Sequence, residues 1–202
     1  METRSREVTT ESMQTSENKP LTLFTQALTK IGGELHAFAA RDALVDWMQN
    51  ILREKNVSRV VLASDRFITD ELGINTKSFA SSEERKIIDA REDSESIAQA
   101  EAGITAAWAG FADTGAVAIR SQAGERRATS LLPPTHICIL REEDIYFTMD
   151  LTIEKMYEII RSGSSSALTF IAGPSRTADI EKVLVTGVHG PKQLIVCVLK
   201  KG

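Results

Sequence analysis

The chain has 202 residues, 42% of them hydrophobic, and a formal net charge of −4, which suits one domain with a short tail. The sequence contains no basic run of the nucleic-acid-binding type, no apolar run long enough to span a bilayer and no signal-peptide core, so we expect a cytoplasmic protein. Its two cysteines, Cys138 and Cys197, lie in apolar, strand-like runs, and no Cys-x-x-Cys motif is present. We therefore expect no cofactor in this chain, and in particular no ordinary cysteine-ligated iron–sulfur cluster.

The first half of the chain alternates helical and strand-like segments behind a polar beginning. Residues 1–20 are polar, which predicts a disordered tail before a domain over residues 21–202. The predicted helices are Leu21–Lys30, Arg41–Lys55 and Ser64–Leu72, and the predicted strands are Glu34–Phe38 and Arg59–Ala63. The charged run Ser81–Glu95 is predicted to be a solvated loop or surface helix.

The second half continues the alternation. The predicted strands are Ile104–Ala112, Ala116–Arg120 and His136–Leu140, and the predicted helices are Ser94–Ala102 and Ile153–Arg161. Asp113-Thr114-Gly115 separates two of these strands and predicts a hairpin or a sharp bend. Strands that alternate with helices are typical of an α/β fold with a mainly parallel sheet flanked by helices.

The most informative stretch runs from Ala167 to Pro191 and continues into an apolar run. It predicts a strand at Leu168–Ala172, a helix at Ala178–Thr186 and a second strand at Leu194–Leu199. We expect these to form a βαβ unit, in which the two strands are parallel and the crossover is right-handed. Gly173–Thr177 would then follow the carboxyl end of the first strand, where ligands bind in open α/β sheets.

Gly173, Ser175, Arg176 and Thr177 are candidate anion-binding residues. The N–H groups at a helix start, two hydroxyls and one guanidinium could hold a phosphate or a carboxylate. The alternative is an ordinary capped helix, in which the hydroxyls satisfy the helix's own donors. Acidic residues in the first turns of the predicted helix favour that alternative, because they complement the helix dipole and repel an anion.

Asp113 and His136 are the candidate catalytic residues. Asp113-Thr114-Gly115 could present a carboxylate and a hydroxyl beside a close backbone approach, so Thr114 and Gly115 join the substrate- or anion-binding candidates; the alternative is simply a turn. His136 could act as an acid, a base or a ligand, but too few further ligands are evident for a metal site, and a structural role competes. His189 lies between turn residues and is a candidate partner-binding residue.

Four motifs, taken in order, resemble the LUD domain family and, within it, the lactate utilisation protein C branch (the LutC/YkgG type). They are Asp113-Thr114-Gly115, Ser130–His136 (SLLPPTH), GPSRTADIE and GVHGP. The resemblance implies the NagB/RpiA/CoA transferase-like fold of ribose-phosphate isomerases and CoA transferases. It also implies a subunit of a cytoplasmic system that oxidises L-lactate to pyruvate. The resemblance implies that this chain is a non-catalytic or accessory subunit in that system, and that iron–sulfur clusters are to be expected on its partner subunits.

Two other functions remain open from the sequence. The chain could be a stand-alone enzyme that acts on a phosphorylated or carboxylate metabolite at the carboxyl edge of the sheet, with Asp113, Thr114, His136 and Ser175. It could also be a binding module for such a small anion, without chemistry. No Gly-x-Gly-x-x-Gly and no Walker motif is present, so the ordinary nucleotide-binding fingerprints are absent from the sequence.

Overall fold

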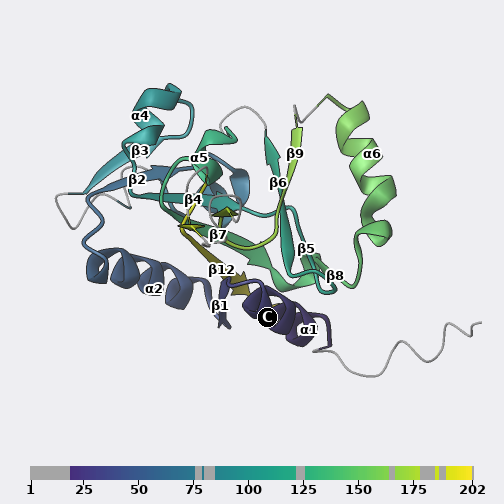
Figure 1. Cartoon of the computed structure of the whole chain (residues 1–202). Coiled ribbons are helices and arrows are strands. Elements are labelled where there is room, and N and C mark those ends of the chain that lie inside the picture. Colours follow the sequence, from purple (N-terminus) through teal and green to yellow (C-terminus); the bar gives the residue numbers. More distant parts are fainter. Residues whose placement is uncertain are drawn as a thin grey trace, which may run out of the picture.

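The computed structural model describes residues 19–75, 79, 85–121, 126–163, 167–177, 185–186 and 190–201. A six-stranded sheet with the order β1-β12-β7-β4-β2-β3 forms its centre (Figure 1). These strands are β1 (Glu34–Phe38), β2 (Arg59–Leu62), β3 (Lys86–Asp89), β4 (Ala102–Ala106), β7 (Thr135–Arg141) and β12 (Gln193–Leu199). All neighbouring strands in this sheet are parallel, which confirms the predicted α/β class with a mainly parallel sheet flanked by helices.

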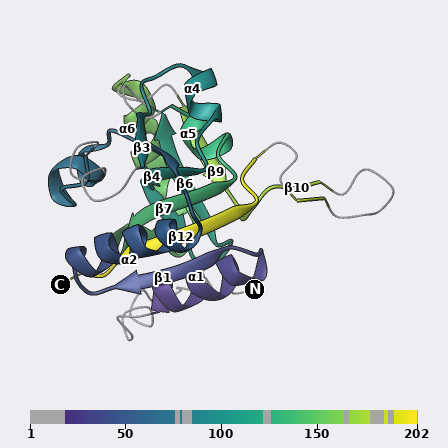
Figure 2. The ribbon, with the colours of Figure 1, turned by 90° about the vertical axis from the view of Figure 1, so that its left-hand side faces the viewer.

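A four-stranded sheet with the order β8-β5-β6-β9 packs beside the first. Its strands are β5 (Ala109–Phe111), β6 (Ala116–Ser121), β8 (Ile145–Tyr146) and β9 (Ala167–Ile171). β5 and β6 form an antiparallel pair around residues 112–115, which confirms the hairpin predicted there. A short antiparallel pair, β10 (Arg176–Thr177) and β11 (Val185–Thr186), lies apart from both larger sheets (Figure 2).

Helices cover the outer faces of the two sheets and fill the space between them (Figure 1). They are α1 (Lys19–Lys30), α2 (Arg41–Glu54), α4 (Ser94–Ala98), α5 (Ala128–Leu131) and α6 (Ile153–Arg161), with the short segments η2 (Phe67–Glu71), η3 (Glu142–Asp144) and η4 (Met149–Thr152). α2 shows why such a segment forms: Leu44, Met48 and Leu52 recur every four residues and are all buried on one stripe. Burying each of these side chains contributes about 1.5–3 kcal/mol.

The strands of the central sheet are buried on both faces and divide their side chains between two cores. On β12, Ile195 and Cys197 pack with α2 and η2, while Leu194, Val196 and Val198 point to the other core. That second core contains Phe24 and Leu28 of α1 and the inward face of β6. The alternation follows from the two-residue period of a strand, which places successive side chains on opposite faces.

The predicted βαβ unit is wrong. Strand β9 pairs antiparallel with β6 in the four-stranded sheet, whereas β12 lies between β1 and β7 in the parallel sheet. Val185 and Thr186, predicted as the end of a helix, form a strand paired with Arg176 and Thr177; residues 178–184 lie outside the described part of the chain. Both apolar runs are strands, as predicted, but the identity of a strand's partner depends on contacts far away in sequence.

Some other predicted boundaries also shift. Lys19 and Pro20 already belong to α1, and residues 1–18 of the predicted tail lie outside the described residues. The charged run 81–95 contains the strand β3, which forms because Ile88 is buried among helix and strand residues. The helix predicted over Ser94–Ala102 ends at Ala98, and Asp93 caps it by accepting a hydrogen bond from the Ser96 N–H at 2.8 Å.

Candidate functional site

A cleft of about 260 Å³ opens at the carboxyl ends of β2, β4 and β7. Side chains from both sheets and from η2 line it. They are Asp65, Arg66, Phe67, Glu71, Ala106, Ala107, Trp108, Arg120, Arg141 and Asp144. The carboxyl edge of a parallel sheet is where open α/β proteins bind ligands, so this cleft is the candidate functional site.

The floor of the cleft is the place where the chain crosses between the two sheets. Ala107 N–H donates to the Ile139 carbonyl on β7 at 2.7 Å, and Trp108 N–H donates to the Ala118 carbonyl on β6 at 2.7 Å. Consecutive residues are thereby tied to different sheets. Arg120 follows two residues after Ala118 and reaches the cleft from the four-stranded sheet.

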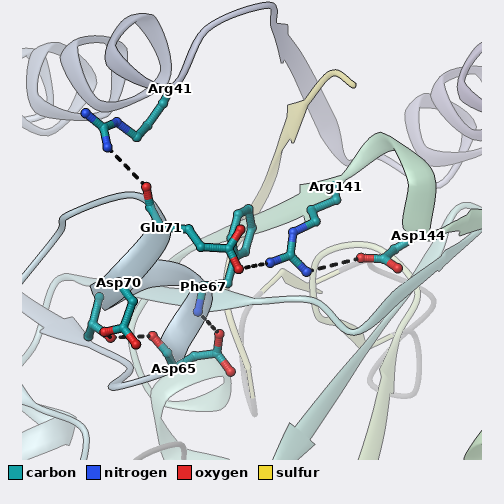
Figure 3. A network of polar contacts seen from close by, with 8 residues as sticks. Arg41, Asp65, Phe67, Asp70, Glu71, Arg141 and Asp144 are labelled. Carbon is teal, nitrogen blue, oxygen red and sulfur yellow. Dashed lines mark hydrogen bonds and ion pairs between the residues drawn. The ribbon is translucent and has the colours of Figure 1, made fainter. Parts of the chain in front are cut away.

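Arg141, the last residue of β7, is held on several sides (Figure 3). Its guanidinium forms an ion pair with Glu71 of η2 and a second, at 3.8 Å, with Asp144 of η3. The guanidinium carbon also lies 4.1 Å from the centre of the Phe67 ring. A guanidinium with three such contacts has a fixed orientation, so Arg141 links the η2 wall of the cleft to the strand that ends there.

The opposite part of the η2 wall is set by Asp65. Its Oδ1 accepts a hydrogen bond from the Phe67 N–H at 2.8 Å, which starts the helical turn after β2, within the helix predicted over Ser64–Leu72. Phe67 and Ile68 bury their side chains in the α2 core and anchor the turn. Arg66, between Asp65 and Phe67, is exposed and lines the cleft.

Asp144 has the clearest electrostatic perturbation in the cleft. Burial raises the pKa of its carboxyl, and Glu143 and Glu71 act in the same direction, while Arg141 and Lys155 oppose the shift. A carboxyl whose pKa is raised in a cleft is a recognised marker of functional sites, because it can hold or release a proton nearer to neutral pH.

The predicted anion-binding residues lie elsewhere. Ser175 N–H donates to the Pro191 carbonyl at 2.8 Å, just before β12 begins, and Lys192 N–H donates to the Pro134 carbonyl at 2.8 Å, just before β7 begins. This is the amino edge of the parallel sheet, not its carboxyl edge. The predicted site also required a helix start, but Arg176 and Thr177 form the backbone of strand β10.

Asp113, Thr114 and Gly115 lie in the β5–β6 turn, outside the carboxyl-edge cleft. Asp113 and Thr114 are exposed. Gly115 has φ +70°, and a Cβ built there would lie 2.3 Å from the Leu28 nitrogen of α1. Gly173 packs against the end of the same helix, because its Cβ would lie 2.7 Å from the Ile31 carbonyl oxygen. Both glycines therefore serve close backbone packing.

His136 is fully buried at the beginning of β7. Its Nε2 and the Thr105 Oγ1 share a hydrogen bond of 2.8 Å, and burial lowers its pKa to about 3. Within the described residues, its Nδ1 has no hydrogen-bond partner. The residue is a neutral part of the core and does not line the cleft, which is the structural role weighed above.

The remaining predicted features are placed as follows. His189 lies outside the described residues, so its role in partner binding stays a prediction. Within the described ranges, no group of three or more His, Cys, Asp or Glu side chains could hold a metal ion. No helix in the same ranges is long and apolar enough to cross a membrane.

The sequence reasoning missed the residues that line the cleft. Arg141 directly follows one segment that was predicted as a strand, and Asp65 stands two residues after another, so a search for polar residues after every strand would have found them. Arg120 and Trp108 belong to mostly apolar segments, in which no local pattern singled them out. Their meeting depends on the crossing of the chain between two sheets, which no local pattern records.

Comparison with known proteins identifies the family. The model of the LUD domain matches residues 21–199. A "Lactate utilization protein C" of Deinococcus radiodurans is 39% identical over 102 residues, covering 50% of this chain and 47% of that protein. One of Halalkalibacterium halodurans is 35% identical over 156 residues, covering 74% and 66%. The "Uncharacterized protein YkgG" of Escherichia coli is 32% identical over 156 residues, with the same coverage.

The chain thus spans 47% to 66% of the length of these relatives. A crystal structure of a DUF162 family protein from Deinococcus radiodurans has the same fold, with a TM-score of 0.67 and 23% identity, and the match covers 91% of this chain and 98% of that one. The fold, the motifs and the matched range agree with one another. This chain belongs to the LUD domain family.

Proposed function

We propose that this chain is an accessory subunit of an L-lactate utilisation system that oxidises lactate to pyruvate together with iron–sulfur partner subunits. The LUD domain match over residues 21–199, combined with relatives that are named "Lactate utilization protein C", carries the proposal. Oxidation of lactate to pyruvate releases two electrons and two protons, so the system requires an electron acceptor. In the proposed division of labour, clusters on the partners accept those electrons.

The positions of the two thiols support placing the clusters on partners. Cys138 packs in the core that contains α1, and Cys197 packs in the core that contains α2, so they lie on opposite faces of the sheet. Burial also raises the pKa of the Cys197 thiol, which disfavours the thiolate that a cluster iron needs.

An exposed apolar stripe supports the role of a subunit. Tyr157 and Ile160 of α6 are each 61% exposed, Leu151 of η4 is 60% exposed, and Ile153 begins the same helical stripe at 45%. Ile153, Tyr157 and Ile160 recur at helical spacing and Leu151 precedes them, while Met156 packs against the four-stranded sheet. Several exposed apolar side chains on one helix are typical of protein–protein contacts, and we assign this stripe to the iron–sulfur partner.

The test is co-purification of iron with the tagged chain from its own cells grown on L-lactate. We expect a coloured preparation that contains iron and acid-labile sulfide, whereas the chain expressed alone is colourless. Replacing Tyr157→Lys together with Ile160→Glu should remove the iron without changing the melting temperature, because both side chains are mostly exposed. Leu132→Lys, at an exposed apolar residue beyond α5, is the matched control and should retain the iron.

Two results would contradict this assignment. The first is a flavin or iron–sulfur spectrum that stays with the chain when it is expressed alone. The second is full retention of iron by the Tyr157→Lys, Ile160→Glu variant, which would place the partner contact on another face.

A further inference from the structure

Two buried side-chain atoms have no hydrogen-bond partner within the described part of the chain. They are Nδ1 of His136, at the beginning of β7, and Oγ1 of Thr129, in α5. Both residues are fully buried. A buried polar atom without a partner destabilises a fold, and native proteins rarely leave one unpaired. Each of these two atoms therefore calls for a partner.

The parallel sheet places His136 in a gap between two apolar clusters. Its register partners are Leu194 on β12 and Gly103 on β4, and Gly103 in turn pairs with Val61 on β2. Residues paired in this way point to the same face of a sheet. Leu194 belongs to the core around α1, whereas Val61 packs with residues of β3 and α4. The histidine and the glycine thus separate the two clusters.

The backbone of α5 fills the space above Gly103, because α5 lies against β4 (Figure 1). A Cβ built on Gly103 would lie 2.0 Å from the carbonyl oxygen of Thr129. Thr129 therefore sits directly on the glycine that neighbours His136 in the sheet. The two residues that carry the unpaired atoms flank the same position of the sheet.

The imidazole of His136 requires a partner at Nδ1 in either tautomer. Its Nε2 shares the 2.8 Å hydrogen bond with the Thr105 hydroxyl, which can donate or accept. A neutral imidazole carries N–H on one nitrogen and a lone pair on the other, and burial keeps this one neutral by lowering its pKa to about 3. A partner that both donates and accepts satisfies Nδ1 whichever nitrogen holds the proton.

The surroundings favour a small and neutral partner. The buried polar side chains that adjoin these two residues, Thr105 and Ser130, carry no charge. The Ser130 hydroxyl already donates to the Arg127 carbonyl at 3.1 Å. An ion buried among uncharged groups and apolar clusters is costly. Water is neutral, donates and accepts, and commonly joins buried groups that are otherwise unpaired.

We propose that an ordered internal water binds here, with hydrogen bonds to both His136 Nδ1 and Thr129 Oγ1. Thr129 directly precedes the Ser130–His136 motif, and His136 is the last residue of that motif. The water therefore joins the two ends of the motif and holds α5 over the beginning of β7. This site is independent of the proposed function, because it involves no lactate and no partner subunit.

A crystal structure of the full chain, at a resolution that shows ordered waters, tests the site directly. We expect a water within hydrogen-bonding distance, about 2.7–3.2 Å, of both His136 Nδ1 and Thr129 Oγ1. A direct hydrogen bond between these two atoms overturns the proposal. A protein group that takes the place of the water on either atom overturns it as well.

Urea unfolding tests the shared partner in solution. Thr129→Val replaces the hydroxyl by a methyl group of similar size. This change should lower the urea midpoint, because the water loses one of its two protein partners. The loss should be smaller in a His136→Phe background, since the two side chains act on the same water. Thr129→Ser keeps a hydroxyl and should therefore keep this coupling to His136.

Thr152→Val is the matched control for that cycle. Thr152 is also a fully buried threonine, and its Oγ1 donates to the Met149 carbonyl at 2.7 Å. Its loss should lower the midpoint equally in the wild type and in His136→Phe. An unchanged or raised midpoint in Thr129→Val would show that the hydroxyl has no partner, and would overturn the proposal. That result and the crystal structure do not depend on the folding of His136→Phe.

Discussion

At the residue scale, His136 makes a testable contribution to the pH dependence of stability. Its pKa is about 3 in the folded chain, against an ordinary value of 6.5, so the unfolded chain binds this proton first. The free energy of unfolding should therefore be independent of this group above pH 6.5. It should fall as pH drops from 6.5 towards 3, by up to about 1.4 kcal/mol per pH unit.

The window from about pH 5 to 6.5 isolates this effect. Asp89 and Glu101, whose pKa values are lowered by their hydrogen bonds, add a loss in the same direction only at lower pH. Urea unfolding of the wild type and of His136→Gln across that window gives the comparison, since the remaining histidines are common to both. Equal slopes for the two proteins would show that His136 is not the neutral, buried group described above.

The candidate residues show what a sequence can and cannot reveal at this scale. At Gly115 the sequence left a close backbone approach open beside a simple turn, and at Gly173 it gave no such indication; the structure shows close backbone packing at both glycines. Their assignment to an anion site does not follow from that, since Gly115 and Gly173 pack against α1. Arg120 and Asp144 gave no local signal, because their proximity arises from the meeting of two sheets.

At the element scale, the packing of the β5–β6 turn on α1 leads to a prediction about glycine. Gly115→Ala introduces a Cβ 2.3 Å from the Leu28 nitrogen at φ +70°. Gly163 has a similar φ of +64°, but nothing lies within 4 Å of its Cβ position. Gly115→Ala should therefore cost roughly 2–5 kcal/mol of unfolding free energy, and Gly163→Ala only about 1–2 kcal/mol.

Urea denaturation of both variants measures the difference. A similar loss in the two would mean that α1 moves away from the turn at little cost, and that the motif glycine is needed only for its backbone conformation. A larger loss in Gly115→Ala would confirm that the turn and the helix pack as a unit. The comparison requires that the slope of the unfolding free energy against urea concentration is the same for both variants.

The helices and strands themselves were largely readable from the sequence. Apolar residues at helical spacing predicted α1, α2 and α6, and short apolar runs predicted β1, β2, β7 and β12. Pairing was not readable. β9 and β12 look alike as apolar runs, yet β9 pairs antiparallel at the edge of the four-stranded sheet and β12 lies inside the parallel sheet. The difference lies in distant partners, β6 for one and β1 and β7 for the other.

At the scale of the whole molecule, two faces carry the candidate sites. The carboxyl-edge cleft is the candidate ligand site, and we propose that the apolar stripe of α6 contacts a protein partner. Within the described residues of the family motifs, Ser175 makes a backbone contact at the amino edge of the parallel sheet, and Gly115 and Gly173 pack against α1 or its end. Family membership was therefore readable from motifs whose described residues do not line the cleft.

The most direct test of the proposed function is L-lactate-dependent reduction of an artificial electron acceptor by the purified iron–sulfur partner subunits, with and without this chain. We predict that the chain alone has no activity, and that the partners reach their full rate only when it is added. The Tyr157→Lys, Ile160→Glu variant should fail to restore that rate, whereas Leu132→Lys should restore it. Oxidation of L-lactate by this chain alone, or a full rate from the partners without it, would contradict the proposal.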